Sequence, residues 1–228
     1  MTEPAKASMR LELGCPVRCS DGVFGELGDV VVDPTRRRVT HLVVQLQHDH
    51  ASARLVPVEL AHPAPGMQPE IVLDCTRAEF DRLEEVQEFA YLRVAEFPVE
   101  EPEWAVGVQD VFALPYYDTL GSGLAPVSDD SHVGVTYDRV PKGAVELRRS
   151  SAVISRDGVT VGHVDGFIVE DREAITHLVL QHGHLWGRRE VVIPIGAVVR
   201  IQNDTATLAL TADEVGALDQ IPVRRWFV

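Results

Sequence analysis

An internal repeat is the feature that most constrains the fold of this chain of 228 residues. An Asp-Gly dipeptide and the hexapeptide THLVVQ, which becomes THLVLQ, each recur at an offset of 136 residues, and the tripeptide VPV recurs as IPI at 137. An offset this constant over about sixty positions predicts two copies of one unit, with single-residue insertions in turns. The matched segments are 21–22 and 157–158, 40–45 and 176–181, and 56–58 and 193–195.

Residues 156–198 are typical of three consecutive strands with their turns. Asp157-Gly158 favours a tight turn, because its central positions require positive φ. Pro194 is expected to end the third strand, since proline has no N–H to donate to a sheet. The β-branched and apolar runs of strand length are 161–170, 175–181 and 189–193. We therefore expect a small antiparallel sheet in each copy.

Each copy ends in a capping box, 76–79 in the first and 211–214 in the second. In this motif a Thr hydroxyl and a Glu carboxylate satisfy the free backbone amides of a helix start. A short helix is predicted after each box, with an apolar face that covers one open end of its unit. The residues of these two faces are Phe80, Leu83 and Val86, and Val215, Leu218 and Ile221.

Both copies resemble the PRC-barrel family. The resemblance rests on GVFGELGDVVVDPTRRRVTHLVV at 22–44 and on 157–198, which is closer to the barrel of the photosynthetic reaction centre H subunit. It implies a mainly β fold with two PRC-type small antiparallel β-barrels, each closed by a short C-terminal helix. It also implies an assembly or interaction module without a common catalytic residue. Because each unit is small for one stable core, we expect the barrels to pack about a pseudo-twofold axis.

The chain departs from two named branches of this family. A reaction centre H subunit begins with a membrane anchor, whereas residues 1–12 here are predicted to be a polar tail, and no stretch approaches the length of a membrane span. Ribosome maturation factors place a different domain before a single barrel. A ribosome or RNA-processing accessory factor is therefore a minor alternative.

The predicted domains are the tail, a first copy at 13–92, an acidic proline-rich connector at 93–143 and a second copy at 144–228. Nine acidic residues and one Arg between 95 and 140 supply eight of the 14 net negative charges. The connector also carries several aromatic groups, too many for a purely solvated linker. We expect its first part, to about Tyr117, to dock on the barrels and 118–131 to be mobile.

Charge and cysteine usage limit the partners and the compartment. A net charge of −14 makes nucleic acid an unlikely partner, because a phosphate-binding surface would act against the overall field. We expect a protein partner with a basic rim, no membrane insertion, and a surface that also allows a homodimer. Cys15, Cys19 and Cys75 lack the paired spacing of a zinc site and are predicted to be buried thiols of a cytoplasmic protein.

Two His-x-His segments are the weak candidates for metal ligands. They are His48-Asp49-His50 and His182-Gly183-His184, at corresponding places of the two copies. Alternate residues of a strand face the same side, so each pair offers two ligands, but no spacing identifies a third. We predict no metal and no other cofactor. A ligand or metal sensor that uses these turns remains the alternative function.

The leading hypothesis is a non-enzymatic scaffold or adaptor that acts by protein–protein interaction. No nucleophile elbow or phosphate-binding loop is present, so no catalytic residue is assigned. The run 36–38 of three Arg is read as a solvated hairpin tip. Aromatic and Arg side chains dominate the energetics of interfaces. The predicted partner-binding residues are Trp104, Tyr116, Tyr117, Trp186, Arg188 and Arg189.

Overall fold

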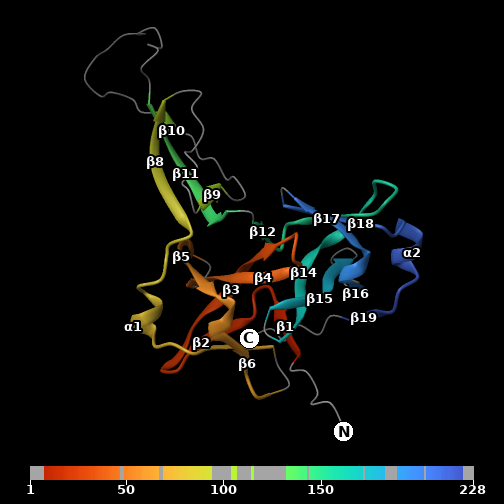
Figure 1. The fold of residues 1–228 in the computed structure, drawn as a ribbon, viewed down its shortest axis with the longest axis horizontal. Coiled ribbons are helices and arrows are strands. Elements are labelled where there is room, and N and C mark those ends of the chain that lie inside the picture. The colour runs from red at the N-terminus through yellow and green to blue at the C-terminus, as the bar shows by residue number, and fades with distance from the viewer. Residues whose placement is uncertain are drawn as a thin grey trace.

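The structure is a computed structural model, and its fold is mainly β (Figure 1). It describes residues 8–46, 49–66, 69–93, 104–106, 114–115, 132–142, 144–171, 173–182, 189–202 and 204–222. We call residues 8–86 the first half and 144–222 the second half. None of the helices in these ranges is long and apolar enough to cross a membrane.

The two halves contain the same elements in the same order. The first half has β1 (Ser8–Glu12), β2 (Pro16–Cys19), β3 (Gly22–Asp33), β4 (Arg38–Leu46), β5 (Asp49–Pro57), the 3-10 helix η1 (Val58–Leu60), β6 (Ala61–Pro63), β7 (Ile71–Leu73) and α1 (Arg77–Phe80). The second half has β12 (Val145–Leu147), β13 (Ala152–Ile154), β14 (Thr160–Glu170), β15 (Ala174–His182), β16 (Arg189–Pro194), η2 (Ile195–Ala197), β17 (Val198–Gln202), β18 (Thr205–Leu208), α2 (Ala212–Gly216) and a further strand, β19 (Gln220–Pro222).

Strand pairing within each half follows one plan. An antiparallel meander runs through β3, β4 and β5 in the first half and through β14, β15 and β16 in the second. A parallel pair joins the second strand of each half to the strand before its α-helix, β2 to β7 and β13 to β18. The three strands predicted for 156–198 are thus confirmed, and they end within one or two residues of the expected bounds.

A glycine near the start of each long strand is required by close packing. A Cβ added to Gly25 would lie 2.5 Å from the carbonyl oxygen of Gln45, and one added to Gly162 would lie 2.3 Å from that of Gln181. No side chain fits at such distances, so the neighbouring strand can cross closely only over glycine. The repeat therefore preserves a steric requirement as well as a hydrophobic pattern.

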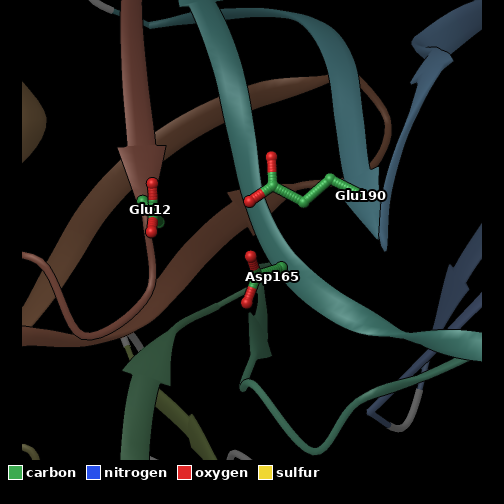
Figure 2. Close-up of side chains that lie close together, drawn as sticks. All are labelled: Glu12, Asp165 and Glu190. Carbon is green, nitrogen blue, oxygen red and sulfur yellow. The ribbon is translucent and has the colours of Figure 1, made fainter. Parts of the chain in front are cut away.

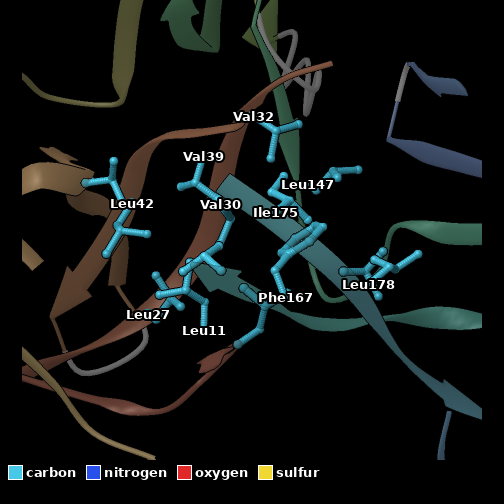
Figure 3. Close-up of a cluster of buried hydrophobic side chains, with 14 of the residues drawn as sticks. Leu11, Leu27, Val30, Val32, Val39, Leu42, Leu147, Phe167, Ile175 and Leu178 are labelled. Carbon is cyan, nitrogen blue, oxygen red and sulfur yellow. The ribbon is translucent and has the colours of Figure 1, made fainter. Parts of the chain in front are cut away.

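Each half contributes its first strand to the sheet of the other half. β1 pairs antiparallel with β14, which places Leu11 opposite Phe167. β12 pairs antiparallel with β3, which places Leu147 opposite Val30. All four side chains belong to one hydrophobic cluster that spans both halves (Figure 3). The core is therefore shared, and neither half buries its apolar side chains alone.

The halves also meet where β4 and β15 begin. Arg38 pairs with Ala174 across this junction. The Val39 N–H donates to the Glu173 carbonyl at 2.9 Å, and the Ile175 N–H donates to the Arg37 carbonyl at 3.0 Å. These two hydrogen bonds are reciprocal, and together with the exchanged strands they join the described strands into one 15-stranded sheet.

The expected closure into two barrels is not seen among the described residues. The sheet follows the order β17-β18-β13-β14-β15-β4-β3-β2-β7-β6 and does not close on itself. Pairing between the starts of β4 and β15 links the halves. Residues 8–12, expected within a polar tail, instead form β1, because Met9 and Leu11 are buried in the shared core.

Both capping boxes are confirmed. Thr76 accepts from the Glu79 N–H and Thr211 accepts from the Glu214 N–H, and each Glu side chain reaches back to its Thr backbone. Each helix makes about one turn and is shorter than the helix predicted from the three-residue spacing of the apolar side chains. Leu83 and Leu218 still pack against the core from the turn after each helix, whereas Ile221 lies in β19.

The residues that lie between the two halves in the sequence form a second sheet, which extends away from the main sheet (Figure 1). It contains β8 (Gln87–Arg93), β9 (Trp104–Val106), β10 (Leu114–Pro115) and β11 (His132–Pro141). β11 pairs with β8 along 132–138, with β10 at 133–134 and with β9 at 139–141. We call this four-stranded sheet the arm. The described strands of the connector thus pair with β8 or with each other, and the expected docking of its first part on the barrels stays a prediction.

Candidate functional site

Three carboxylates from distant parts of the sequence lie together where β1 crosses β14 and β16 (Figure 2). Carboxylate oxygens of Glu12, Asp165 and Glu190 all lie within 4.8 Å of one another. Asp165 occupies a bulge in β14, between the paired residues Val164 and Gly166. Such bulges re-aim a side chain out of the regular alternation of a strand.

Glycine is required beside this bulge. A Cβ added to Gly166 would lie 2.1 Å from the Leu11 carbonyl oxygen. β1 can therefore approach β14 closely enough to bring Glu12 to Asp165 only because position 166 lacks a side chain. The exchange of the first strand and the position of the carboxylates thus depend on the same residue.

Two guanidinium groups face the three carboxylates. Arg10 donates a hydrogen bond to Glu190, and its Nε lies 3.5 Å from Glu12. Arg149 Nε lies 4.0 Å from Asp165. Burial alone would lower the pKa of Arg10, but its hydrogen bond to Glu190 and the surrounding carboxylates raise the pKa above its ordinary value. Arg10 therefore remains a cation, and the cluster is largely neutralised from within.

The chemistry of this cluster favours a structural role. Carboxylate oxygens are the ligands that Ca²⁺ and Mg²⁺ prefer, so these three residues form the set in the described ranges that could hold a hard cation. A divalent cation would have to compete with Arg10 for Glu190 and with Arg149 for Asp165. We therefore read the cluster as an ion-pair network that ties β1 to the second half.

The histidines singled out in the sequence lie at the edges of the described ranges. His50 belongs to β5, the third strand of the first meander, and His182 belongs to β15, the second strand of the second meander, so the two lie on strands that do not correspond. His48 and His184 lie outside the described residues. The expectation that these histidines bind no metal stays a prediction.

The predicted partner-binding residues fall on two separate sheets. Trp104 begins β9 and pairs with Pro141 near the base of the arm. Arg189 begins β16, where it pairs with His182 and is exposed. Tyr116, Tyr117, Trp186 and Arg188 lie outside the described residues, as does the segment 118–131 that was predicted to be mobile. The structure does not bring Trp104 and Arg189 into one site.

All three cysteines are free and buried, as expected. Cys19 Sγ and Cys75 Sγ lie 3.7 Å apart, at the end of β2 and just before α1. Burial raises the pKa of the Cys15 thiol to about 12, and burial with the neighbouring Cys75 does the same for Cys19. These side chains are therefore neutral thiols at physiological pH and poor nucleophiles.

Comparison with known proteins identifies part of this architecture. Residues 149–215 match the family model of the PRC-barrel domain. The match begins before β13 and ends within α2, so the second half contains a PRC-barrel domain. A search of curated proteins found no match.

Proposed function

We propose that this chain is a non-enzymatic cytoplasmic scaffold or adaptor that acts through protein–protein contact. The arm is the observation that carries the proposal. β8 leaves the first half and β11 leads to the second half, and Val86 and Val140 at the base of the arm are buried together in a small cluster with first-half side chains, so both ends of the arm are fixed to the body. A sheet that extends from a rigid body offers its edges and faces to a partner.

We further propose that the first half is a second PRC-type unit, related to the matched one by a pseudo-twofold axis. The common order of elements and the two capping boxes support this relation. The reciprocal exchange of β1 and β12 supports an axis that passes between Arg38 and Ala174, where the two halves pair. Two units related in this way form one body from which the arm extends.

The arm belongs to the most acidic part of the sequence. Residues 95–140 carry nine acidic residues against one Arg, and they include Trp104 in β9. Aromatic side chains supply much of the binding energy at interfaces, and surrounding charges select the partner and speed association. We therefore expect a partner whose contact surface has a basic rim.

Deletion of the connecting segments tests this proposal. A variant in which a short Gly-Ser turn replaces residues 94–131 keeps β8 and β11 as a hairpin and removes β9 and β10. Proteins captured by the full chain from its source cells, and confirmed with the purified partner, should be lost with this variant. An unchanged far-ultraviolet spectrum and melting temperature would show that the body is folded. Equal capture by both chains would contradict the proposal.

A point variant tests how much one aromatic side chain contributes to the binding free energy. Trp104→Ala should weaken binding of the confirmed partner by about 2 kcal/mol or more if this side chain is a hot spot. Raising the salt concentration should slow association more than it speeds dissociation, because salt screens long-range attraction. Surface plasmon resonance separates the two rates. Salt-independent association would exclude the expected basic rim.

A further inference from the structure

A groove lies between the halves, where the turn after β3 meets η2 and β17. Its volume is about 270 Å³. The first half lines it with Pro34, Thr35 and Arg37, and the second half lines it with Ile195 and residues 198–201. Because four consecutive residues of β17 contribute, the strand runs along the groove wall and presents backbone as well as side chains.

The groove is positively charged although the chain is strongly acidic. No Asp or Glu lines it, whereas Arg37 and Arg200 do and are exposed. Among the described residues, neither guanidinium group makes an ion pair or a hydrogen bond. By contrast, the neighbours in the Arg run are paired, Arg36 with Asp33 at 3.8 Å and Arg38 with Glu173 at 2.7 Å. The two groove cations are therefore free to bind an anionic group.

The wall formed by β17 is a sheet edge. β18 is the strand with which β17 pairs in the described part of the chain, and β17 stands at the end of the sheet order. A bulge separates the paired residues Val198 and Arg200 and leaves Val199 without an opposite residue, 67% exposed. An edge strand can accept one more strand through its unpaired backbone groups.

The position of Arg37 is fixed before any ligand binds. Its φ of 55° lies in the left-handed region, and its carbonyl accepts the Ile175 N–H at 3.0 Å. A hydrogen bond from the second half thus fixes the backbone of Arg37, whose side chain lines the groove. A fixed backbone lowers the entropic cost of binding.

We propose that this groove binds an extended acidic segment of a partner protein as an added strand beside β17. Two carboxylates of the segment form charge-assisted hydrogen bonds with Arg37 and Arg200. Its backbone pairs with β17, and an apolar side chain rests on Ile195 and Val198. The apolar lining and the exposed strand edge favour a peptide over a small inorganic anion. This inference does not depend on the arm.

The corresponding place in the first half lacks these features. Glu173 takes the place of Arg37 in the reciprocal hydrogen bonds. The strand of the first half that corresponds to β17 is β6, which pairs with β7 as β17 pairs with β18. In this pairing Pro63 of β6 takes the place of Ile201 of β17, and proline has no N–H to donate. The neighbouring cavity, of about 210 Å³, is lined by both acidic and basic side chains, so its charges are largely paired. The proposal therefore predicts one peptide site per chain.

Fluorescence anisotropy with a synthetic peptide tests the site on the full chain. The probe is an acetylated, amidated peptide of about nine residues that alternates Glu with Val and Thr, long enough for one strand. Arg37→Asn with Arg200→Gln should weaken its binding about tenfold or more, because two charged hydrogen bonds are lost. Asn tolerates the positive φ at position 37. Arg36→Gln is the matched control and should leave the affinity unchanged within about twofold.

Further probes separate the parts of the proposal. Alternate N-methylation of the peptide should abolish binding if the backbone pairs with β17. A Lys-for-Glu peptide should not bind the natural chain but should bind Arg200→Glu, a gain that a misfolded variant could not give. Unchanged affinity of the double Arg variant, competition by inorganic phosphate alone, or two peptides per chain would overturn the proposal. So would a tenfold gain in affinity when residues 94–131 are deleted, because the connector itself would then be the occupant.

Discussion

The two halves share their backbone but differ in how they fill a buried polar position. Cys15 and Ser151 are both buried, and their N–H groups donate to the equivalent carbonyls of Glu12 at 3.0 Å and Arg148 at 2.9 Å. Ser151 Oγ accepts the Arg148 N–H at 2.7 Å, and the backbone of Glu12 forms the equivalent hydrogen bond to the Cys15 thiol, which opposes the effect of burial on the pKa of that thiol. The same turn is therefore stabilised by a hydroxyl in one half and by a thiol, a weaker hydrogen-bonding group, in the other.

A second position shows a larger difference. Cys19 lies against Cys75 with no backbone bond to its sulfur among the described contacts, whereas Ser155 Oγ both accepts from and donates to the backbone of Val159, at 3.1 and 2.9 Å. A buried hydroxyl is costly unless it is hydrogen-bonded, whereas a thiol packs as a small apolar group. The fold therefore requires a small side chain at this position and accepts either a thiol or a hydrogen-bonded hydroxyl.

The exchanged strands provide the strictest test of equivalence. Leu11→Ala and Leu147→Ala should each lower the free energy of unfolding by about 2–5 kcal/mol, because both side chains are fully buried in the shared core. Urea denaturation measures the cost. Hydrogen exchange should accelerate most in β14 for Leu11→Ala and in β3 for Leu147→Ala. Acceleration confined to the half that carries the substitution would contradict the exchange.

The serine positions should be more sensitive than the cysteine positions. Ser155→Ala leaves the Val159 N–H without its side-chain acceptor and should cost about 1–3 kcal/mol. Cys19→Ala removes a small side chain and its weak sulfur–sulfur hydrogen bond to Cys75, and should cost about 1 kcal/mol. Equal losses in chemical denaturation would show that hydrogen bonding does not distinguish the two halves.

Alkaline pH should destabilise the fold through the first half. The pKa of Cys15 is raised from 9.0 to about 12 in the folded chain, so its contribution is complete below pH 9 and is lost as the pH rises toward 12. At pH 10 the loss should be on the order of 1 kcal/mol, because the unfolded thiol ionises first. Cys15→Ser, which adopts the residue of the second half, should reduce the pH dependence measured by thermal unfolding, and the Cys19 thiol, whose pKa is also raised to about 12, should account for part of what remains.

The capping boxes should behave alike. Thr76→Ala and Thr211→Ala should each cost about 1 kcal/mol. Hydrogen bonds from Thr76 and Thr211 lower the pKa of Glu79 and Glu214 below the ordinary value of 4.5. Their contribution is therefore present above pH 4.5 and declines as the pH falls through the lowered values. Glu79→Gln and Glu214→Gln should remove this acid dependence equally, and unequal effects would show that the caps differ.

Local signals in the sequence predicted much of each half. The matched turns, the meander strands and both helix starts depend on residues close in the chain, where propensity and hydrogen bonding act directly. The sequence pattern placed Thr76 and Thr211 correctly at the start of a helix. It overestimated the helix length, because Leu83 and Leu218 reach the core from a turn.

Pairing between strands far apart in the sequence could not be predicted from these local signals. β1 has five residues, and its partner Phe167 lies more than 150 positions away, so no local periodicity reveals the contact. The carboxylate cluster and the groove depend on this pairing and on the junction at Arg38. Arg37 was correctly placed at a hairpin tip, but its neighbour across the groove, Arg200, follows only from the three-dimensional arrangement.

The exchange of first strands bears on how the chain is made. During synthesis β3 must wait for β12, which follows more than a hundred residues later, and β14 must recruit β1 from the beginning of the chain. The first half cannot complete its sheet before β12 has been synthesised, so we expect these distant contacts to slow folding. At high concentration β1 of one molecule can reach β14 of another, which gives a domain-swapped dimer.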